Sequence, residues 1–479
     1  MVALCAMALT TSAKTLVFHL DFNTVHLNRE TIERTLEHVA KSGYTAILWE
    51  VEDAVRWESC PEAAAADAYS KEEFCEILAK SESLGLEPIP LLQTIGHAEY
   101  VLGNDKYRHM RENPDRKNAY CPSKSASRQL SKGLLREYLE LFGSRVRRFH
   151  LGGDEVWGFG SCESCKKREP IELYVEHLCE IAEALRERGI RPGVWHDMIM
   201  HFDPTGKSYA RLPKDFSVWY WNYAHPDGNG WGKGAEEGLR AEVAAGREVF
   251  YCGSVQCSIG DPFFVRYGLH RENLRGSIED TLKEGLSGYC VTSWSRHQSS
   301  KILQYPLVDF AAKRYLNPGG VAEEDWREIT RRYFGPVPVA ALDEMTAYEH
   351  TMIDADGRYV NKYKDGAIAP RGSIRTKFAG RETEARRLAS LARCLAAGTK
   401  EGADALRRIP EKQRGPLVEI ALEAADLKMI WLRAEAMGLA REPMGNVPLE
   451  RTRIFYGKEQ TPESAEKCAV RIYSAYLGQ

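Results

Sequence analysis

Residues 148–156 read RFHLGGDEV, a short apolar run followed by two glycines and two adjacent carboxylates. Seven other short apolar runs, rich in β-branched and aromatic residues, occur at 16–21, 46–51, 87–93, 192–197, 216–221, 248–252 and 288–294. Several of these runs are apolar at nearly every position, which is typical of parallel strands buried on both faces. Together the eight runs predict a parallel β-sheet.

Amphipathic helical patterns separate most of the runs. Residues 30–42 (ETIERTLEHVAKS) have a period near 3.6 and precede Gly43, a suitable helix C-cap, and residues 71–84 and 172–188 show the same pattern. Alternating strands and helices of this number close more readily into a (β/α)8 barrel than into an open doubly wound sheet. The first strand is followed by FNTVHLN, which lacks the glycine-rich turn of a dinucleotide-binding sheet.

The strand pattern ends near residue 307, and four later segments look helical and amphipathic: 323–333, 339–352, 382–395 and 417–439. Residues 372–377 and 446–457 are expected to be connections. We therefore predict a catalytic barrel over residues 14–310 and a mostly α-helical C-terminal domain over residues 311–479. The apolar faces of these helices also offer a surface for a homodimer.

Composition excludes several classes of function. Lys and Arg number 65 against 68 Asp and Glu, a net charge of −3, so the chain has no basic footprint for nucleic acid. No apolar run reaches the roughly 18–20 residues of a membrane span. Residues 1–13 (MVALCAMALTTSA) are apolar but lack a basic start. They are either a signal peptide, which would make the protein secreted or periplasmic, or a leader on a cytoplasmic protein.

Chemistry in a (β/α)8 barrel occurs at the carboxyl ends of the strands, where Asp154 and Glu155 lie. Neighbouring strand residues point to opposite faces, so this pair is poorly placed to flank one bond as nucleophile and acid. The pair is better suited to a site in which one carboxyl contacts the glycosidic oxygen and the other contacts a neighbouring group of the same sugar. Gly152 and Gly153 are interpreted as room for that sugar. A surface Asp-Glu dipeptide would explain neither the strand nor the glycines.

Other residues near predicted strand ends fit a sugar site. His97 follows a glycine and precedes Glu99, and it can tune a carboxyl or bind a hydroxyl. Trp195, Trp221 and Trp294 end separate strands, and an indole ring suits the apolar face of a pyranose. Hydroxyl contacts are assigned to further charged residues, for most of which an ordinary salt bridge is an equal alternative: Asp21, Glu52, Asp53, Asp197 and Arg296.

Cys162 and Cys165 form a CxxC motif after the fourth strand. A CxxC motif is a moderate signal for zinc, and the sequence has no second one. Cys60 and Cys121 lie in the loops after the second and third strands, next to this loop around the barrel. A four-cysteine structural zinc site, disulfides and free thiols all stay open, with disulfides and free thiols together favoured over zinc.

With these motifs the chain resembles glycoside hydrolase family 20, the β-N-acetylhexosaminidases, and in particular their hexosaminidase D-like branch. The stretches that carry the resemblance run from about residue 16 to residue 310 in family order: LVFHLDFN, AILWEVEDAVRW, IPLLQTIGHAEYVL, FHLGGDEV, VWHDM, YWNY and VTSWSRH. The Asp-Glu motif is quite specific, and the ordered set is much more so.

The resemblance implies exo-acting, retaining hydrolysis of terminal β-GlcNAc or β-GalNAc from glycans, in which the substrate's own 2-acetamido oxygen attacks the anomeric carbon. Glu155 would be the general acid and then the base, and Asp154 would stabilise the acetamido nitrogen. Tyr223 would bind the acetamido carbonyl oxygen, and Trp195, Trp221 and Trp294 would wall the pocket. The chemistry would need no metal or organic cofactor.

Three departures from the family pattern stand out. The first strand lacks the arginine that binds outer sugar hydroxyls, Gln93 replaces an acidic residue four positions before His97, and Arg296 replaces an acidic residue after Trp294. The preference between GlcNAc and GalNAc therefore stays open. Two alternative functions also remain: a barrel hydrolase of another N-acetyl sugar, sulfated or peptide-linked, and a non-catalytic carbohydrate-binding protein.

Overall fold

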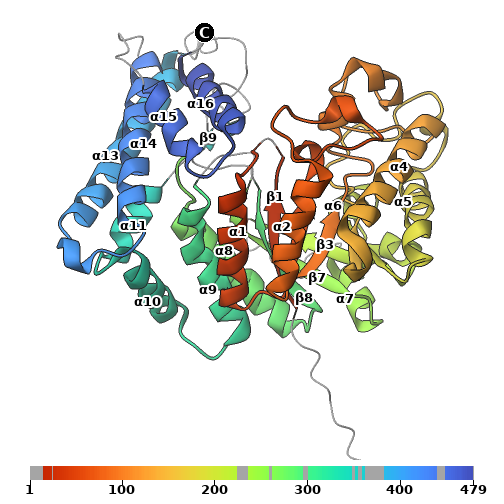
Figure 1. Ribbon diagram of the computed structural model, residues 1–479, viewed down its shortest axis with the longest axis horizontal. Coiled ribbons are helices and arrows are strands. Elements are labelled where there is room, and N and C mark those ends of the chain that lie inside the picture. The colour runs from red at the N-terminus through yellow and green to blue at the C-terminus, as the bar shows by residue number, and fades with distance from the viewer. Residues whose placement is uncertain are drawn as a thin grey trace, which may run out of the picture.

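The computed structural model describes residues 15–23, 25–223, 236–257, 262–294, 300–347, 351–353, 359–361, 382–439 and 448–477. Within them, eight parallel strands form a closed barrel in sequence order, and β8 pairs with β1 (Figure 1). The strands are β1 (Thr15–Asp21), β2 (Ala46–Glu50), β3 (Glu87–Leu91), β4 (Arg148–His150), β5 (Arg191–Trp195), β6 (Ser217–Trp221), β7 (Val249–Gln256) and β8 (Gly288–Ser293). Each strand coincides with one of the predicted runs, so the predicted barrel is confirmed. The predicted leader at 1–13 lies outside the described residues.

The strands are apolar on both faces because both faces are buried. One cluster fills the inside of the barrel and includes Val17, Leu48, Leu91, Trp219 and Phe250. A larger cluster lies between the sheet and the surrounding helices. The long apolar runs of the sequence are therefore the two-sided burial expected of a parallel barrel.

Helices surround the barrel and alternate with its strands: α1 (Arg29–Ser42), α2 (Lys71–Ser83), α3 (Glu99–Leu102), α4 (Ser125–Phe142), α5 (Pro170–Arg186), α6 (Asp197–Phe202), α7 (Glu236–Ala244), α8 (Tyr267–Lys283) and α9 (Tyr305–Leu316). The sequence specifies their ends. Gly43 follows α1 in the left-handed conformation, with φ 96°, and Ser70 and Glu73 form a capping box at the start of α2. Helix α9 packs against both α8 and α1, so it closes the ring of helices.

The C-terminal segment is mostly helical: α10 (Ala322–Phe334), α11 (Val339–Thr346), α13 (Glu382–Arg407), α14 (Val418–Leu439), α15 (Leu449–Gly457) and α16 (Pro462–Leu477). Two predictions here were wrong. The expected connection at 446–457 contains α15, whose Phe455 and Tyr456 are buried against Phe263 of the barrel. The helix expected at 339–352 ends at Thr346, and a small hairpin of β9 (Thr351–Ile353) and β10 (Tyr359–Asn361) follows it.

The early end of α11 has a long-range cause. The ammonium of Lys428, buried in α14, donates hydrogen bonds to the carbonyl oxygens of Met345 and Ala347, at 3.0 and 2.7 Å. These contacts satisfy carbonyls at the helix C-terminus and hold the chain in an extended turn at Ala347. Because the partner lies about eighty residues away along the chain, no local pattern could place this helix end.

The C-terminal helices contact the barrel at the carboxyl ends of its strands. Leu27, after β1, forms an isolated bridge with Gln460, and the hydroxyl of Tyr456 donates to the carbonyl of Pro262, after β7. The carboxylate of Glu459 accepts hydrogen bonds from the hydroxyl of Ser300 and the backbone N–H of Lys301, after β8. Helix α15 and the turn between α15 and α16 therefore stand beside the loops that follow β1, β7 and β8 (Figure 1).

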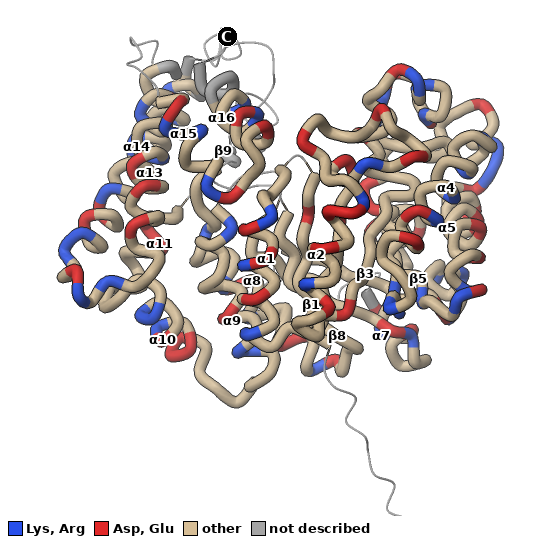
Figure 2. The backbone as a smooth tube through the Cα atoms, in the orientation of Figure 1, with Lys and Arg blue, Asp and Glu red and all other residues tan. Residues whose placement is uncertain are grey.

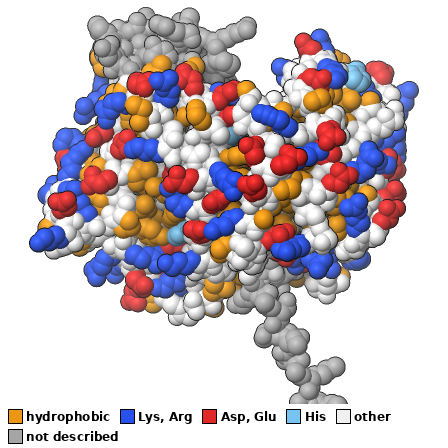
Figure 3. Space-filling model, in the orientation of Figure 1, with side chains coloured by type: hydrophobic (Ala, Val, Ile, Leu, Met, Phe, Trp, Pro, Cys, Tyr) orange, Lys and Arg blue, Asp and Glu red, His pale blue; other side chains and the backbone are white. Residues whose placement is uncertain are grey.

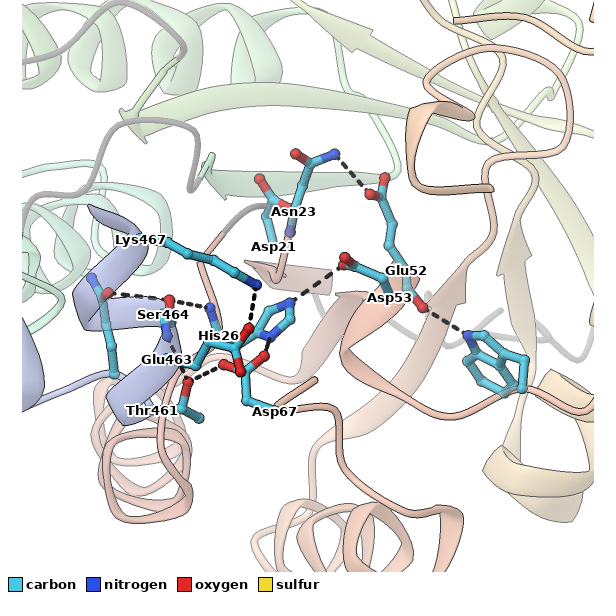
Figure 4. A network of polar contacts seen from close by, with 12 residues as sticks. Asp21, Asn23, His26, Glu52, Asp53, Asp67, Thr461, Glu463, Ser464 and Lys467 are labelled. Carbon is cyan, nitrogen blue, oxygen red and sulfur yellow. Dashed lines mark hydrogen bonds and ion pairs between the residues drawn. The ribbon is translucent and has the colours of Figure 1, made fainter. Parts of the chain in front are cut away.

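A buried histidine lies at this junction. Figure 4 shows the ring of His26 between the carboxylates of Asp53 and Asp67, at 3.3 and 2.8 Å. The hydroxyl of Thr461 donates to Asp67, and the backbone N–H of His26 donates to Ser464 at 3.0 Å. Burial lowers the pKa of His26, but hydrogen bonds to the two carboxylates more than offset this and raise the pKa from 6.5 to about 9.

This junction should make stability depend on pH. Because the folded protein holds the His26 proton more tightly than the unfolded chain, the contribution is full below about pH 6.5 and is lost as pH rises through about 9. The shift corresponds to roughly 3 kcal/mol. We expect His26→Gln to lower the urea midpoint strongly at pH 6 and much less above pH 9. The exposed His109 supplies a control, His109→Gln. An equal loss for His26→Gln at both pH values would contradict this prediction.

Both signs of charge occur over the described part of the molecule. Acidic and basic residues are interspersed along the chain (Figure 2), and charged and apolar side chains are mixed over the face in Figure 3. None of the described helices is both long and apolar enough to cross a bilayer. The mixed charge of this face agrees with the near balance of acidic and basic residues in the sequence.

Candidate functional site

A pocket of about 100 Å³ opens at the carboxyl ends of the barrel strands. Seven side chains predicted from the sequence line it together: Asp21, His97, Asp154, Glu155, Trp221, Tyr223 and Trp294. A larger hollow, near His38 and Asp309, lies beside the C-terminal end of α1, which leads into β2. It is therefore near the opposite end of the barrel, where barrel enzymes do not place their chemistry.

The backbone explains how adjacent carboxylates reach one pocket. Strand β4 ends at His150, earlier than predicted, so Asp154 and Glu155 do not follow strand alternation. Gly152 and Gly153 have φ of 67° and 90°, and Glu155 has φ of 47°, in the left-handed region that non-glycine residues rarely adopt. The N–H of Glu155 donates to a carboxylate oxygen of Asp197 at 2.9 Å. Strain of this kind is found where a side chain must be aimed at a site.

The two glycines have a different role from the one predicted. A side chain at Gly152 would collide with the amide of Gln93, at 2.1 Å, and one at Gly153 would collide with the hydroxyl of Tyr174, at 2.5 Å. Both glycines are thus required by their left-handed backbone and by neighbouring protein atoms. The interpretation that they leave room for the ligand was wrong.

His97 links the carboxylate pair. Its Nε2 lies 3.3 Å from Oδ2 of Asp154 and 3.5 Å from Oε2 of Glu155. It too has a left-handed backbone, with φ of 46°. The loop that carries it packs tightly on the Asp154 backbone, since a side chain at Gly96 would lie 2.4 Å from the Asp154 carbonyl oxygen. The loops after β3 and β4 therefore fix the histidine against both acids.

The environments of the two acids differ. The Asp154 side chain is 7% exposed, whereas the Glu155 side chain is 40% exposed. Burial raises the pKa of Asp154, but the charge and hydrogen bond of His97, together with a hydrogen bond from Gln93 at 3.3 Å, lower it below its usual value. Asp154 therefore stays ionised at neutral pH. The site combines a fixed buried carboxylate with a carboxyl open to ligand and water.

Aromatic rings form one side of the pocket. The indole N–H of Trp294 donates to the hydroxyl of Tyr223 at 2.8 Å, and Trp221 stacks on Tyr223 with ring centroids 5.5 Å apart. Trp221 ends β6, and Tyr223 and Trp294 follow β6 and β8, while polar residues at the ends of β1 and β2 complete the lining. A pocket lined by both aromatic rings and polar groups suits a pyranose ring, which has both kinds of surface.

Three predicted ligand contacts lie elsewhere. Trp195 is fully buried beneath the pocket, 5.8 Å from Trp294 between ring centroids, so it supports the wall without lining it. Asp197 accepts the Glu155 N–H and is not among the lining residues, and burial next to Asp154 raises its pKa. Glu99 is exposed at the start of α3. Arg296 lies outside the described residues.

Polar lining residues were partly missed. Glu50 ends β2 and lines the pocket, with one oxygen 3.0 Å from His19 and the other accepting from Gln93 at 2.9 Å. Asn23 also lines it and donates to Glu52 at 2.7 Å. Glu50 could have been predicted from the sequence, because a carboxylate at the last position of an apolar strand is unusual. The prediction chose the neighbouring residues Glu52 and Asp53, which fall in the turn after β2.

Lys301 was missed for a different reason. It is 4% exposed, donates to Ser293 at 2.7 Å, and has its pKa lowered to about 8 by burial, against the opposing charges of Asp21 and Glu459. It supplies positive charge near the acidic side of the pocket, where the first strand lacks an arginine. Its position depends on Glu459 of the C-terminal segment, which no local pattern reveals.

Part of the chain is similar to known proteins. Residues 50–258 match the family model described as glycosyl hydrolase family 20, catalytic domain. Hexosaminidase D of Bos taurus is 33% identical over 190 residues, covering 38% of this chain and 55% of that protein. Hexosaminidase D of Homo sapiens is 26% identical over 282 residues, covering 54% and 56%. The chain thus spans about half the length of these two relatives.

The fold is also found among solved structures. The exo-β-N-acetylglucosaminidase of Vibrio harveyi, a GH20 protein solved in complex with N-acetylglucosamine, superposes with a TM-score of 0.50 at 14% identity, covering 66% of this chain and 57% of that one. At this identity the likeness supports the barrel fold alone. The family model and the sequence relatives add to this: residues 50–258 of the barrel match a glycosyl hydrolase family 20 catalytic domain, and the chain is similar to the two hexosaminidase D proteins over part of its length.

Proposed function

We propose that this protein is an exo-acting, retaining β-N-acetylhexosaminidase that removes terminal β-linked GlcNAc or GalNAc from glycans. The observation that carries the proposal is the pair Asp154 and Glu155, joined through His97 and placed in one pocket with Tyr223. The match of residues 50–258 to the glycosyl hydrolase family 20 model supports the same class of reaction. The relatives' names apply to proteins of which this chain spans about half, so the activity is proposed from the site as well.

In the first step, the carbonyl oxygen of the substrate's 2-acetamido group forms a bond to the anomeric carbon as the glycosidic C–O bond breaks. The departing oxygen takes the proton of Glu155. Positive charge that builds on the acetamido nitrogen is stabilised by ionised Asp154, and the hydroxyl of Tyr223 holds the acetamido carbonyl oxygen. The product of this step is a cyclic oxazolinium on the sugar.

In the second step, water attacks the anomeric carbon from the side that the leaving group vacated. The Glu155 carboxylate takes a proton from that water as the bond between the acetamido oxygen and the anomeric carbon breaks. The two inversions give net retention. Trp221 and Trp294 pack on the sugar, and Asp21, Glu50 and Asn23 are placed to accept or donate hydrogen bonds at its hydroxyls.

A panel of aryl glycosides tests the proposal. We expect turnover of aryl β-GlcNAc and aryl β-GalNAc and no comparable turnover of the aryl β-glucoside, because glucose has no acetamido oxygen. Comparable cleavage of the glucoside would rule out substrate assistance. Binding of N-acetylhexosamine without turnover of either aryl substrate would favour a carbohydrate-binding protein, and turnover only of sulfated or peptide-linked N-acetyl sugars would favour another hydrolase.

Assembly is a separate proposal. Ile454 of α15 and Val470 of α16 are apolar side chains exposed to 53% and 42%. We propose that this face of the C-terminal helices contacts a second copy of the chain, so homodimer formation stays a prediction.

A further inference from the structure

Three cysteines and a glutamate meet beside the active site. Cys121 lies in the loop between β3 and α4, and Cys162 and Cys165 lie in the loop after β4. The sulfur of Cys121 is 3.7 Å from that of Cys162 and 3.7 Å from that of Cys165. One carboxylate oxygen of Glu112 joins them, and the four ligand atoms all lie within 4.8 Å of one another.

The sulfur spacing fits a shared metal ion. A disulfide requires a sulfur–sulfur distance of about 2.05 Å, far shorter than either distance here. Tetrahedral zinc with bonds of about 2.3 Å to sulfur places two thiolates about 3.8 Å apart. Both distances that involve Cys121 match the zinc value.

Glu112 supplies the second, independent observation. It is 2% exposed, and one carboxylate oxygen accepts the backbone N–H of Cys162 at 2.9 Å. Its other oxygen, Oε2, is buried and has no hydrogen-bond partner among the described residues, and within the same part of the chain no ion pair to Glu112 is found. A buried carboxylate oxygen left without a partner is costly. A cation between Glu112 and the three sulfurs would remove that cost.

The backbone holds these ligands in place from two sides. Glu112 and Cys121 flank an antiparallel bridge between Arg111 and Tyr120, with the Glu112 N–H donating to Ala119 at 3.0 Å and the Cys121 N–H donating to Met110 at 2.9 Å. Around the CxxC motif, backbone N–H groups donate to the carbonyls of both cysteines, folding the motif into a tight turn. The arrangement is that of a built site and not of cysteines scattered through a core.

Cys60 does not belong to this group. The sequence placed it with the other three cysteines, but the structure puts it just before the short turn Pro61–Ala63, outside the cluster. Glu112 stands in its place, from the same loop as Cys121. Of the alternatives that the sequence left open, the four-cysteine set is therefore not the one that the structure brings together.

We propose that Glu112, Cys121, Cys162 and Cys165 bind one Zn²⁺ ion that fastens the loop after β3 to the loop after β4. Four protein ligands fill a tetrahedral zinc site and leave no open position for substrate, so the ion is structural. The hydroxyl of Ser123, 3.0 Å from the sulfur of Cys165, donates to that thiolate from outside the ligand set.

The position of the ion gives it a consequence for the active site. One of the two loops carries His97, and the other carries Asp154 and Glu155. The loops also touch where Gly96 meets the Asp154 backbone and where Asn118 donates to the carbonyl of Trp157 at 3.3 Å. Fastening them together fixes the histidine relative to both acids. Zinc removal should therefore loosen a geometry that the reaction needs, although the ion takes no part in the chemistry.

Elemental analysis of the full-length protein tests the site without any activity assay. Protein purified without a metal-affinity tag and dialysed against metal-free buffer should contain about one zinc per chain. Cys121→Ser and Cys162→Ser should lose most of it, and Glu112→Gln should lower zinc retention against a competing chelator. Cys179→Ser is the matched control, because Cys179 is half-buried in α5 and outside the cluster, and it should keep the full zinc content.

A cobalt-substituted protein covers the case in which the serine variants fail to fold. Wild-type protein produced with Co²⁺ should show the intense visible bands of tetrahedral cobalt bound to thiolates, and zinc should abolish them. Absence of zinc and of these bands in the wild type would overturn the proposal, as would full zinc content in folded serine variants. A disulfide between two of the three cysteines, found by peptide mass analysis of protein kept without reductant, would overturn it as well.

Discussion

Asp154→Asn is expected to slow hydrolysis of every aryl N-acetylhexosaminide by roughly 10²–10³-fold, the usual loss when one preorganised electrostatic partner is removed. The loss should be the same for poor and good leaving groups, because attack by the acetamido oxygen is required whichever group departs. Asparagine has nearly the size of aspartate, and Gln93 and His97 already surround this position. The variant should therefore fold and fail in the chemistry.

Binding of an intermediate mimic gives the same prediction a second readout. A thiazoline analogue of the cyclised sugar should bind the wild type tightly and Asp154→Asn weakly, since Asp154 is held ionised next to His97. A plain N-acetylhexosamine should show a much smaller difference. Equal thiazoline affinity in the two proteins would show that Asp154 does not stabilise the charge on the acetamido group.

Glu155→Gln is expected to fail in a different way. Loss of a general acid costs about 10²–10⁴-fold for substrates whose leaving groups need a proton. The loss should shrink for dinitrophenyl glycosides, which depart without protonation. Measuring kcat/KM for a series of aryl leaving groups gives a steep dependence for the variant and a shallow one for the wild type.

Glu99→Gln is the matched control for this series. Glu99 is an exposed carboxylate on the loop that also carries His97, and it lies outside the pocket, so its variant should keep the wild-type dependence. If Asp154→Asn instead recovers with good leaving groups while Glu155→Gln does not, the two roles are reversed.

The sequence predicted the fold well because two-sided burial leaves a local trace. Each barrel strand is a run of apolar residues, and caps such as Gly43 and Ser70 mark helix ends. Features set by distant partners left no such trace. Helix α11 ends where Lys428 meets its carbonyls, and α15 was missed because its buried face packs on Phe263 of the barrel. Both depend on contacts that only the folded chain makes.

In the candidate site too, some residues could be predicted from the local sequence and others depend on contacts of the folded chain. Asp154, His97 and Trp294 could be predicted because they follow strands whose ends must meet. Trp195 was expected in the pocket wall, but its side chain points into the barrel, since a strand end alone does not decide which side a side chain takes. Adjacent acids share the pocket only because Glu155 adopts a left-handed backbone. Lys301 depends on Glu459, which is 158 residues away.

Participation of the acetamido group is the central claim, and substrates with a weakened acetamide test it most directly. Aryl β-N-acetylglucosaminides bearing mono-, di- and trifluoroacetyl groups have carbonyl oxygens that become progressively poorer nucleophiles while the leaving group stays the same. The proposed mechanism predicts that kcat/KM falls steeply and steadily along this series. A flat response, with the unsubstituted acetyl substrate and its three fluorinated analogues cleaved at similar rates, would contradict it.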